Sequence, residues 1–197
     1  MCPGNTGGMV DQGRIKVLNA HNYRRGLLAK GQIRNGKNPN NKNLPTAYYM
    51  PRMTYDCNVE AEAINYAKTC TMTKSEQVDR EGYGENVYVH NAPYAEPVST
   101  FDTAVKSWWT QIFQDGINWG LKFTENLRDK RIDQSGFIQM AWAKSTKLGC
   151  AIQTCSSSSF IVCRYSPAGN VVNEVIYQAG KTCGGCLATC NKTDGLC

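Results

Sequence analysis

Ten cysteines in a chain of 197 residues constrain the fold more than any other feature. Metal sites usually group cysteine with histidine, and this chain has only two histidines, His21 and His90. The even count and wide scatter instead indicate disulfides formed in an oxidising compartment, and so a secreted, extracellular protein. The cysteines expected to pair are Cys2, Cys57, Cys70, Cys150, Cys155, Cys163, Cys183, Cys186, Cys190 and Cys197. Their connectivity stays open, because ten cysteines allow on the order of 10³ pairings.

The length predicts one domain with a small appendage. Single domains run to about 250 residues, so we expect residues 1–182 to share one core. Residues 183–197 are too short for a core and predict a cysteine-rich tail held by disulfides. Zinc binding and thioredoxin-type chemistry at Cys183 and Cys186 are disfavoured, because the pair lies in a Gly-rich tail and does not open a helix.

No apolar stretch approaches the roughly 18 residues that a membrane span requires, so we expect none. Since no basic and apolar leader precedes Cys2, we expect the chain to be a mature form. Asn191 begins an Asn-Lys-Thr tripeptide in a loop-like context and is a candidate glycosylation site.

The net charge of +6 is scattered along the chain. Arg34, Lys37 and Lys42 lie in an Asn-rich segment, and further basic residues lie between 128 and 131. Nucleic-acid-binding proteins gather such charge on one face, so an ordinary solvated surface is favoured and nucleic acid is not an expected partner. Weak binding to acidic glycans or lipid headgroups stays as an alternative.

Three segments with helical periodicity predict helices at 11–30, 56–71 and 99–113. Asp56 is suited to cap the second. The aromatic residues of the third are expected to pack in the core. The Asn-, Gly- and Pro-rich residues 34–46 predict a loop.

Strands are predicted at 84–89, 137–142, 147–154 and 160–165, with a hairpin connection at 156–159. Helices early in the chain and strands late indicate an α+β fold, with helices on an antiparallel sheet.

Four stretches, in this order along the chain, carry a family resemblance. They read HNYRR at 21–25, GENVY at 84–88, SGFIQMAW at 135–142 and CRYSPAGN at 163–170. They resemble the HNxxR, GEN[IL]Y, GHFTQMVW and CxYxPxGN motifs of the CAP superfamily, which holds venom allergen 5-like, cysteine-rich secretory and plant pathogenesis-related proteins. The cysteine distribution and the tail look most like the single-domain Ancylostoma-secreted, or activation-associated, proteins of parasitic nematodes.

The resemblance implies a disulfide-rich α-β-α sandwich, with a short antiparallel sheet between helices and many loops. It also implies a structural role for the motif residues. These are His21, Asn22, Arg25, Asn86, Tyr165, Pro167, Gly169 and Asn170. Because His21 lies on the apolar face of a helix, we expect a hydrogen-bonded core histidine.

Members of the superfamily typically carry two histidines and two glutamates in a central cleft, and this tetrad binds a divalent cation in several of them. The corresponding positions here are Lys74, Glu85, Gln111 and Gly136, so only Glu85 keeps a ligand. A glycine offers no side chain, and a neutral amide is a poor zinc ligand. The resemblance therefore implies a degenerate tetrad that holds no metal and no cofactor.

Two arrangements of this cavity stay open. Lys74 can replace the metal as the counter-charge of Glu85 and lower its pKa. Alternatively, Lys74 points to solvent and backbone N–H groups satisfy Glu85. Gly136 can either enlarge the cleft or let another part of the chain approach it.

The loss of the tetrad removes a general base, and no other nucleophile and base pair is visible, so we expect no enzymatic activity. The resemblance implies a secreted nematode protein with a role in host interaction or immune modulation, and we predict that it acts through surface binding. The alternative is carriage of a sterol or fatty acid in an apolar slot beside Trp108, Trp109 and residues 117–123. The expected partner is an unidentified host protein or lipid, and the expected state is a monomer or weak homodimer.

Overall fold

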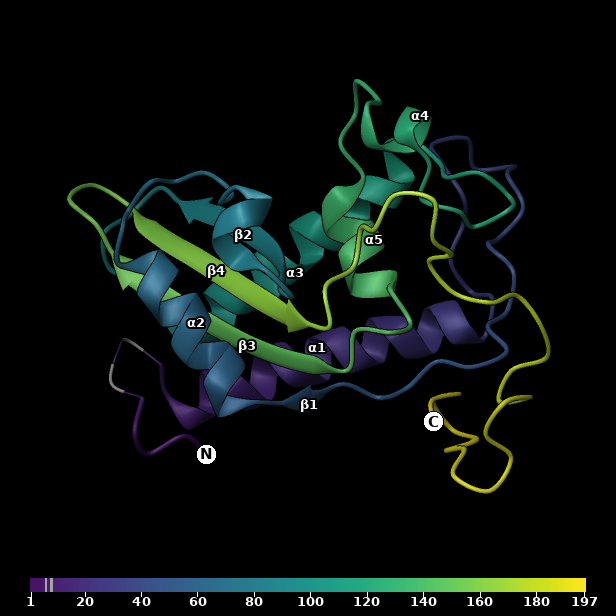
Figure 1. The fold of residues 1–197 in the computed structure, drawn as a ribbon, viewed down its shortest axis with the longest axis horizontal. Helices are drawn as coiled ribbons and strands as arrows, with labels where there is room; N and C mark the ends of the chain where they lie inside the picture. The colour runs from purple at the N-terminus through teal and green to yellow at the C-terminus, as the bar shows by residue number, and fades with distance from the viewer. Residues whose placement is uncertain (6, 8) are drawn as a thin grey trace.

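The chain folds into a small sheet with helices on both faces (Figure 1). The computed structural model describes residues 1–5, 7 and 9–197. Helix α2 covers one face of the sheet, while α1, α3 and α5 pack together behind the other face. The architecture is therefore α+β with three layers, as the sequence and the resemblance predicted.

The described residues form five α-helices, two 3₁₀ turns and four strands. The α-helices are α1 (Asp11–Ala29), α2 (Cys57–Ala67), α3 (Pro97–Thr110), α4 (Glu125–Arg128) and α5 (Ser135–Ala141). The 3₁₀ turns are η1 (Gln77–Arg80) and η2 (Gln111–Phe113). The strands are β1 (Thr54–Tyr55), β2 (Gly84–His90), β3 (Lys147–Thr154) and β4 (Ser159–Ser166).

The sheet has the order β1-β3-β4-β2 and is mixed, which corrects the expectation of a purely antiparallel sheet. Strands β2, β4 and β3 are antiparallel neighbours, but β1 pairs with β3 in parallel. Strand β1 has two residues, which is too short for any periodic signal. It forms because the N–H groups of Thr54 and Asp56 donate to the carbonyls of Thr146 (2.8 Å) and Leu148 (2.9 Å).

The prediction of a strand at 137–142 is wrong, because this segment is helix α5. Every residue from Gly136 to Ala141 is buried, so the helix has no polar face to give it a 3.6-residue pattern. A short apolar run of this kind cannot be distinguished from a buried strand by periodicity alone.

The long helices lie close to the predicted ranges, and the bounds of α2 have a local explanation. Asp56 caps α2 by accepting hydrogen bonds from the N–H groups of Asn58 and Val59. Helix α2 ends at Ala67, before the left-handed residues Cys70 and Met72 (φ 50° and 60°).

All ten cysteines are paired. The pairs are Cys2–Cys57, Cys70–Cys155, Cys150–Cys163, Cys183–Cys190 and Cys186–Cys197. The first two fasten the chain on either side of α2, the third joins facing residues of β3 and β4, and the last two lie within the tail.

The tail at 183–197 folds back against the rest of the chain. Leu196 is buried in the main core, and the N–H of Cys197 donates to the carbonyl of Met50 (2.9 Å). The division at residue 182 stays a prediction. Asn191 is exposed and also stays a predicted glycosylation site.

A buried chain of hydrogen bonds connects, across the layers, residues of the motifs that carry the family resemblance. The His21 Nδ1–H donates to the Val17 carbonyl (2.8 Å), which leaves Nε2 to accept from the Tyr165 hydroxyl (2.9 Å). Asn86 donates to the Tyr165 hydroxyl (3.1 Å) and to the Gly136 carbonyl (3.0 Å). This hydrogen-bonded chain requires a neutral His21, and burial lowers the pKa of His21 to about 3.

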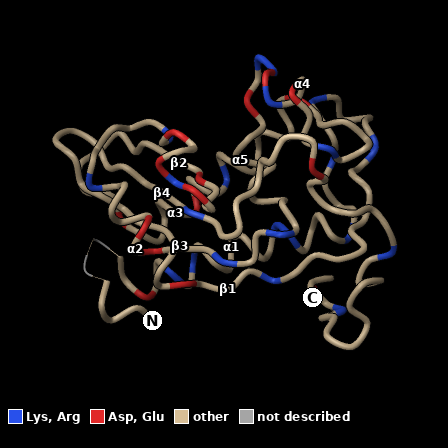
Figure 2. The backbone as a smooth tube through the Cα atoms, in the orientation of Figure 1, with Lys and Arg blue, Asp and Glu red and all other residues tan. Residues whose placement is uncertain are grey.

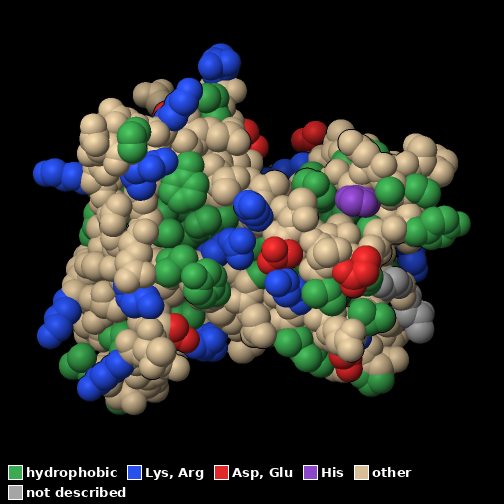
Figure 3. Space-filling model, turned by 180° about the vertical axis from the view of Figure 1, so that it is seen from behind, with side chains coloured by type: hydrophobic (Ala, Val, Ile, Leu, Met, Phe, Trp, Pro, Cys, Tyr) green, Lys and Arg blue, Asp and Glu red, His purple; other side chains and the backbone are tan. Residues whose placement is uncertain are grey.

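Basic and acidic residues occur in many separate parts of the chain (Figure 2). On the face shown in Figure 3, basic side chains are separated by acidic and uncharged ones. None of the helices that the structure describes combines the length and apolarity needed to span a bilayer.

The lowered pKa of His21 predicts that acid weakens the fold above the range in which carboxylates titrate. The unfolded chain binds a proton near its usual pKa, whereas folded His21 does not until about pH 3. The contribution of His21 to the free energy of unfolding is therefore full above roughly pH 6.5. It falls by about 1.4 kcal/mol per pH unit below that value. Urea unfolding near pH 7.5 and near pH 5.5 should differ by about 1.4 kcal/mol in the free energy of unfolding.

The variant His21→Gln should lose this pH dependence, while His90→Gln at the end of β2 should keep it. An equal dependence in both variants would show that another group causes it.

Candidate functional site

The structure brings the four candidate tetrad positions together around one small cavity of about 120 Å³. Glu85 comes from β2, Gln111 from the start of η2 and Gly136 from α5, and Lys74 precedes η1. The other lining residues are Asn86, Val87, Trp108, Asp133 and Ser135.

Glu85 is fully buried, and both of its carboxylate oxygens have partners. Oε1 accepts from the backbone N–H of Ser75 (2.8 Å) and from the Ser75 hydroxyl (2.9 Å). Oε2 accepts from Arg164 Nε at 3.1 Å. Arg164 is itself buried and also reaches Glu62 (3.2 Å). The carboxylate is thus neutralised by protein groups and has little capacity left for a ligand.

The hypothesis that Lys74 is the counter-charge of Glu85 is therefore wrong, because Arg164 takes that role. Arg164 stands directly opposite Glu85 in the antiparallel pairing of β2 and β4. The alternative is correct in part, since a backbone N–H of Ser75 contributes. Lys74 is half-buried, and its pKa is lowered by loss of hydration and then by repulsion from Arg80, against weaker attraction to Asp133 and Glu85.

Gln111 occupies the space that the absent side chain of Gly136 leaves. Its Oε1 accepts from the backbone N–H of Phe137 at 3.0 Å. A Cβ built on Gly136 would lie 2.8 Å from that oxygen and 3.1 Å from the Cβ of Trp108. Of the two roles left open for Gly136, close approach by another part of the chain is therefore the one observed.

The other motif residues lie outside this cavity and hold segments together. Arg25 is fully buried and donates to the carbonyls of Pro51 (2.8 Å), Trp142 (2.7 Å) and Met140 (3.1 Å). Asn22 exchanges two hydrogen bonds with the backbone of Met53 (2.8 and 3.0 Å).

The residues after β4 fasten it to α5 in the same way. The N–H of Gly169 donates to Gln139 (3.0 Å), and Asn170 donates to the Ser135 carbonyl (3.0 Å). The carbonyl of Pro167 accepts from the hydroxyl of Ser145 (2.7 Å).

Sequence analysis missed Arg164 and Ser75 as partners of Glu85. The signal for Arg164 was present in principle. Aligning GENVY and CRYSP as antiparallel neighbours places Glu85 opposite Arg164, a cross-strand pair of opposite charge. Ser75 had no comparable signal, because a loop brings it to the cavity.

The sandwich, the disulfides and the cavity define a cysteine-rich protein of the CAP type, and comparison with known proteins agrees. The sequence profile of the Cysteine-rich secretory protein family (CAP) matches residues 18–165. The chain belongs to this family.

Individual relatives extend the match to the whole chain. Ancylostoma secreted protein of Ancylostoma caninum is 37% identical over 199 residues, which cover 100% of this chain and 46% of that protein. Cysteine-rich secretory protein 2 of Homo sapiens is 30% identical over 162 residues, covering 78% of this chain and 61% of that protein. The chain therefore spans less than two thirds of either curated relative.

The crystal structure of NaASP2 with Zn²⁺ matches with a TM-score of 0.91 at 36% identity, and 100% of both chains is covered. The cavity of the present chain does not fit such an ion. The four tetrad positions offer an amine, an amide, a glycine and a carboxylate already bound by Arg164 and Ser75. Asp133, also in the lining, is exposed and accepts from the N–H and hydroxyl of Ser135. Among the described residues, no group of three or more His, Cys, Asp or Glu side chains is placed to hold a metal.

The assignment of Arg164 as counter-charge predicts unequal effects of two substitutions. Arg164→Met leaves a buried carboxylate without its cation and should lower the free energy of unfolding by about 3 kcal/mol. Lys74→Met removes a partly desolvated ammonium and should change stability by less than about 1 kcal/mol. Urea unfolding of both variants at neutral pH provides the comparison, and the reverse order would restore Lys74 as the partner of Glu85.

Proposed function

We propose that this chain is a secreted, non-catalytic binding protein that acts on host molecules through its surface. The observation that carries the proposal is the state of the cavity. The buried carboxylate of Glu85 is held by Arg164 and Ser75, and Gln111 packs against Gly136. The other carboxylate of the lining, Asp133, accepts from the N–H and the hydroxyl of Ser135. A hydrolytic site needs a free general base or a metal-activated water, and these groups supply neither.

His21 and the cysteines support the same conclusion. His21 is neutral, fully buried and hydrogen-bonded through both ring nitrogens, so it has no free position for substrate. All ten cysteines are in disulfides, so none is a nucleophile.

The location and the host are supported by the relatives and by the disulfides. Five disulfides persist best outside the reducing cytosol. The relative from Ancylostoma caninum is named a secreted protein. Together with the resemblance to secreted proteins of parasitic nematodes, this favours a role at the contact between parasite and host.

Lipid carriage finds no specific support. The aromatic residues expected to line an apolar slot, Trp108 and Trp109, are buried in the core together with Ile112. Phe123 is also buried there.

A metal titration with a restored ligand set tests the proposal. The chain as it stands should show no saturable zinc binding by isothermal titration calorimetry. The triple variant Lys74→His, Gln111→Glu and Gly136→His should gain it, because imidazole and carboxylate ligands then converge on Glu85. A matched control adds Glu85→Gln to the triple variant and should bind more weakly.

Sub-micromolar zinc binding by the unaltered chain would overturn the proposal. So would hydrolysis of a peptide or ester substrate that Glu85→Gln abolishes.

A further inference from the structure

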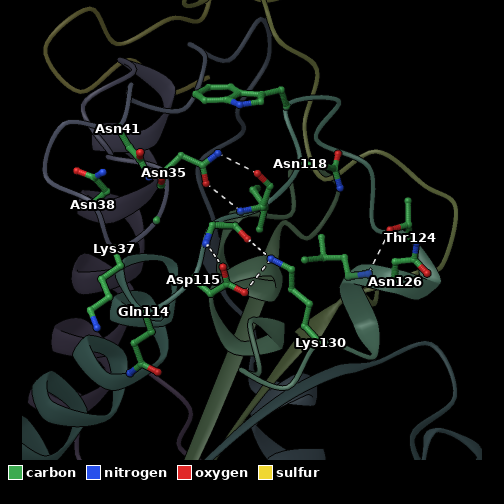
Figure 4. Close-up of a pocket in the computed structure, with 15 residues that line it drawn as sticks. Asn35, Lys37, Asn38, Asn41, Gln114, Asp115, Asn118, Thr124, Asn126 and Lys130 are labelled. Carbon is green, nitrogen blue, oxygen red and sulfur yellow. Dashed lines mark hydrogen bonds and ion pairs between the residues drawn. The ribbon is translucent and has the colours of Figure 1, made fainter.

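A second cavity, of about 730 Å³, lies between the 34–46 loop and the segment that follows η2 (Figure 4). It is separate from the candidate tetrad cavity, since the two have no lining residue in common. Its volume falls within the range of roughly 300–1,000 Å³ that is usual for small-molecule sites.

The floor of this cavity is held in place by hydrogen bonds between the two segments. The Asn35 side chain donates to the Ile117 carbonyl and accepts from the Ile117 N–H, both at 2.8 Å. Lys130 Nζ donates to Asp115 Oδ2 (2.8 Å) and to the Gly116 carbonyl (2.7 Å). A Cβ on Gly116 would lie 2.7 Å from Asn35 Oδ1, so only glycine permits this approach. A cavity built in this way exists before any ligand arrives, which lowers the ordering cost of binding.

An indole ring stands at the edge of the cavity with much of its surface in water. Trp119 is 55% exposed, whereas Trp108, Trp109 and Trp142 are each exposed by no more than 4%. The turn that carries it is closed by Asn118, whose side chain donates to the Lys122 carbonyl (2.7 Å) and accepts from the Lys122 N–H (3.1 Å). The backbone of Trp119 is thus held so that the ring stays exposed beside the cavity.

The polar groups of the rim are mainly amides that remain available to a ligand. Gln114 and Asn126 are exposed, come from opposite sides of the cavity, and make no side-chain hydrogen bond within the described residues (Figure 4). A carboxamide offers both a donor and an acceptor. Hydroxyl groups, which also donate and accept, are its natural complement.

The charge of the lining is low. Lys130 is paired with Asp115, and Lys37 is the one other charged residue among those that line the cavity. An anionic ligand such as a phosphate or sulfate ester would need several converging cations. A single exposed lysine does not supply them.

We propose that this cavity binds a neutral oligosaccharide. A pyranose ring has an apolar C–H face, which fits the exposed indole of Trp119, and a rim of hydroxyls, which fits the amides of Gln114 and Asn126. The inference rests on the proposed binding function and assigns the partner to the class of glycans.

Acrylamide quenching of tryptophan fluorescence tests the proposal, because Trp119 is the accessible tryptophan. The probes are mannotriose, lactose and triacetylchitotriose at millimolar concentration. We expect at least one of them to shield the fluorescence in a saturable way. Trp119→Ala should abolish the response, and Asn126→Ala should weaken affinity about fivefold, as expected for one lost hydrogen bond.

Tyr94→Ala is the matched control, because Tyr94 is 87% exposed and precedes the opposite end of α3. It should leave sugar binding unchanged, and saturation-transfer NMR with the same probes gives a readout independent of tryptophan. Circular dichroism should show that Trp119→Ala remains folded.

Absence of binding by all three sugars, or NMR binding that survives Trp119→Ala, would overturn the glycan assignment and leave the non-catalytic binding function standing. Cleavage of a bound sugar, detected by mass spectrometry, would instead overturn the non-catalytic function.

Discussion

The buried hydrogen bonds among His21, Tyr165 and Asn86 are the interaction on which the rest of the structure depends. They connect α1, β4 and β2, and Asn86 extends the connection to the Gly136 carbonyl in α5. Each donor meets an acceptor only when His21 is neutral, and burial favours that form. Since an unsatisfied buried polar group costs about 1–3 kcal/mol, loss of one member would weaken all the layers it joins.

The side chains around the cavity beside this hydrogen-bonded chain satisfy one another. Gln111 can approach α5 because Gly136 has no Cβ, and its amide oxygen accepts from the Phe137 N–H. Arg164 faces Glu85 across the sheet and pairs with its buried carboxylate. A buried carboxylate without a cation is costly, and the pair with Arg164 removes that cost.

Much of the fold could be predicted because helical periodicity, turn residues and cysteine usage are local signals. Helix α1, the N-terminal cap of α2 and the β3–β4 hairpin follow from them. Helix α5 could not be recognised, because it is buried on all sides and so lacks a polar face. Strand β1 could not either, since two residues carry no pattern.

The sequence by itself determined the family resemblance and the layers it implies, that all ten cysteines form disulfides, and the four positions that meet at the cavity. Only the tertiary structure decided the disulfide partner of each cysteine. It also decided that Arg164 rather than Lys74 pairs with Glu85, and that Gln111 fills the space beside Gly136. It also brought the 34–46 loop against the segment that carries Trp119, which is far from it in the sequence. The physical reason is that motifs and periodicity report local preference, whereas charge pairing and cavity shape depend on distances between segments far apart in the chain.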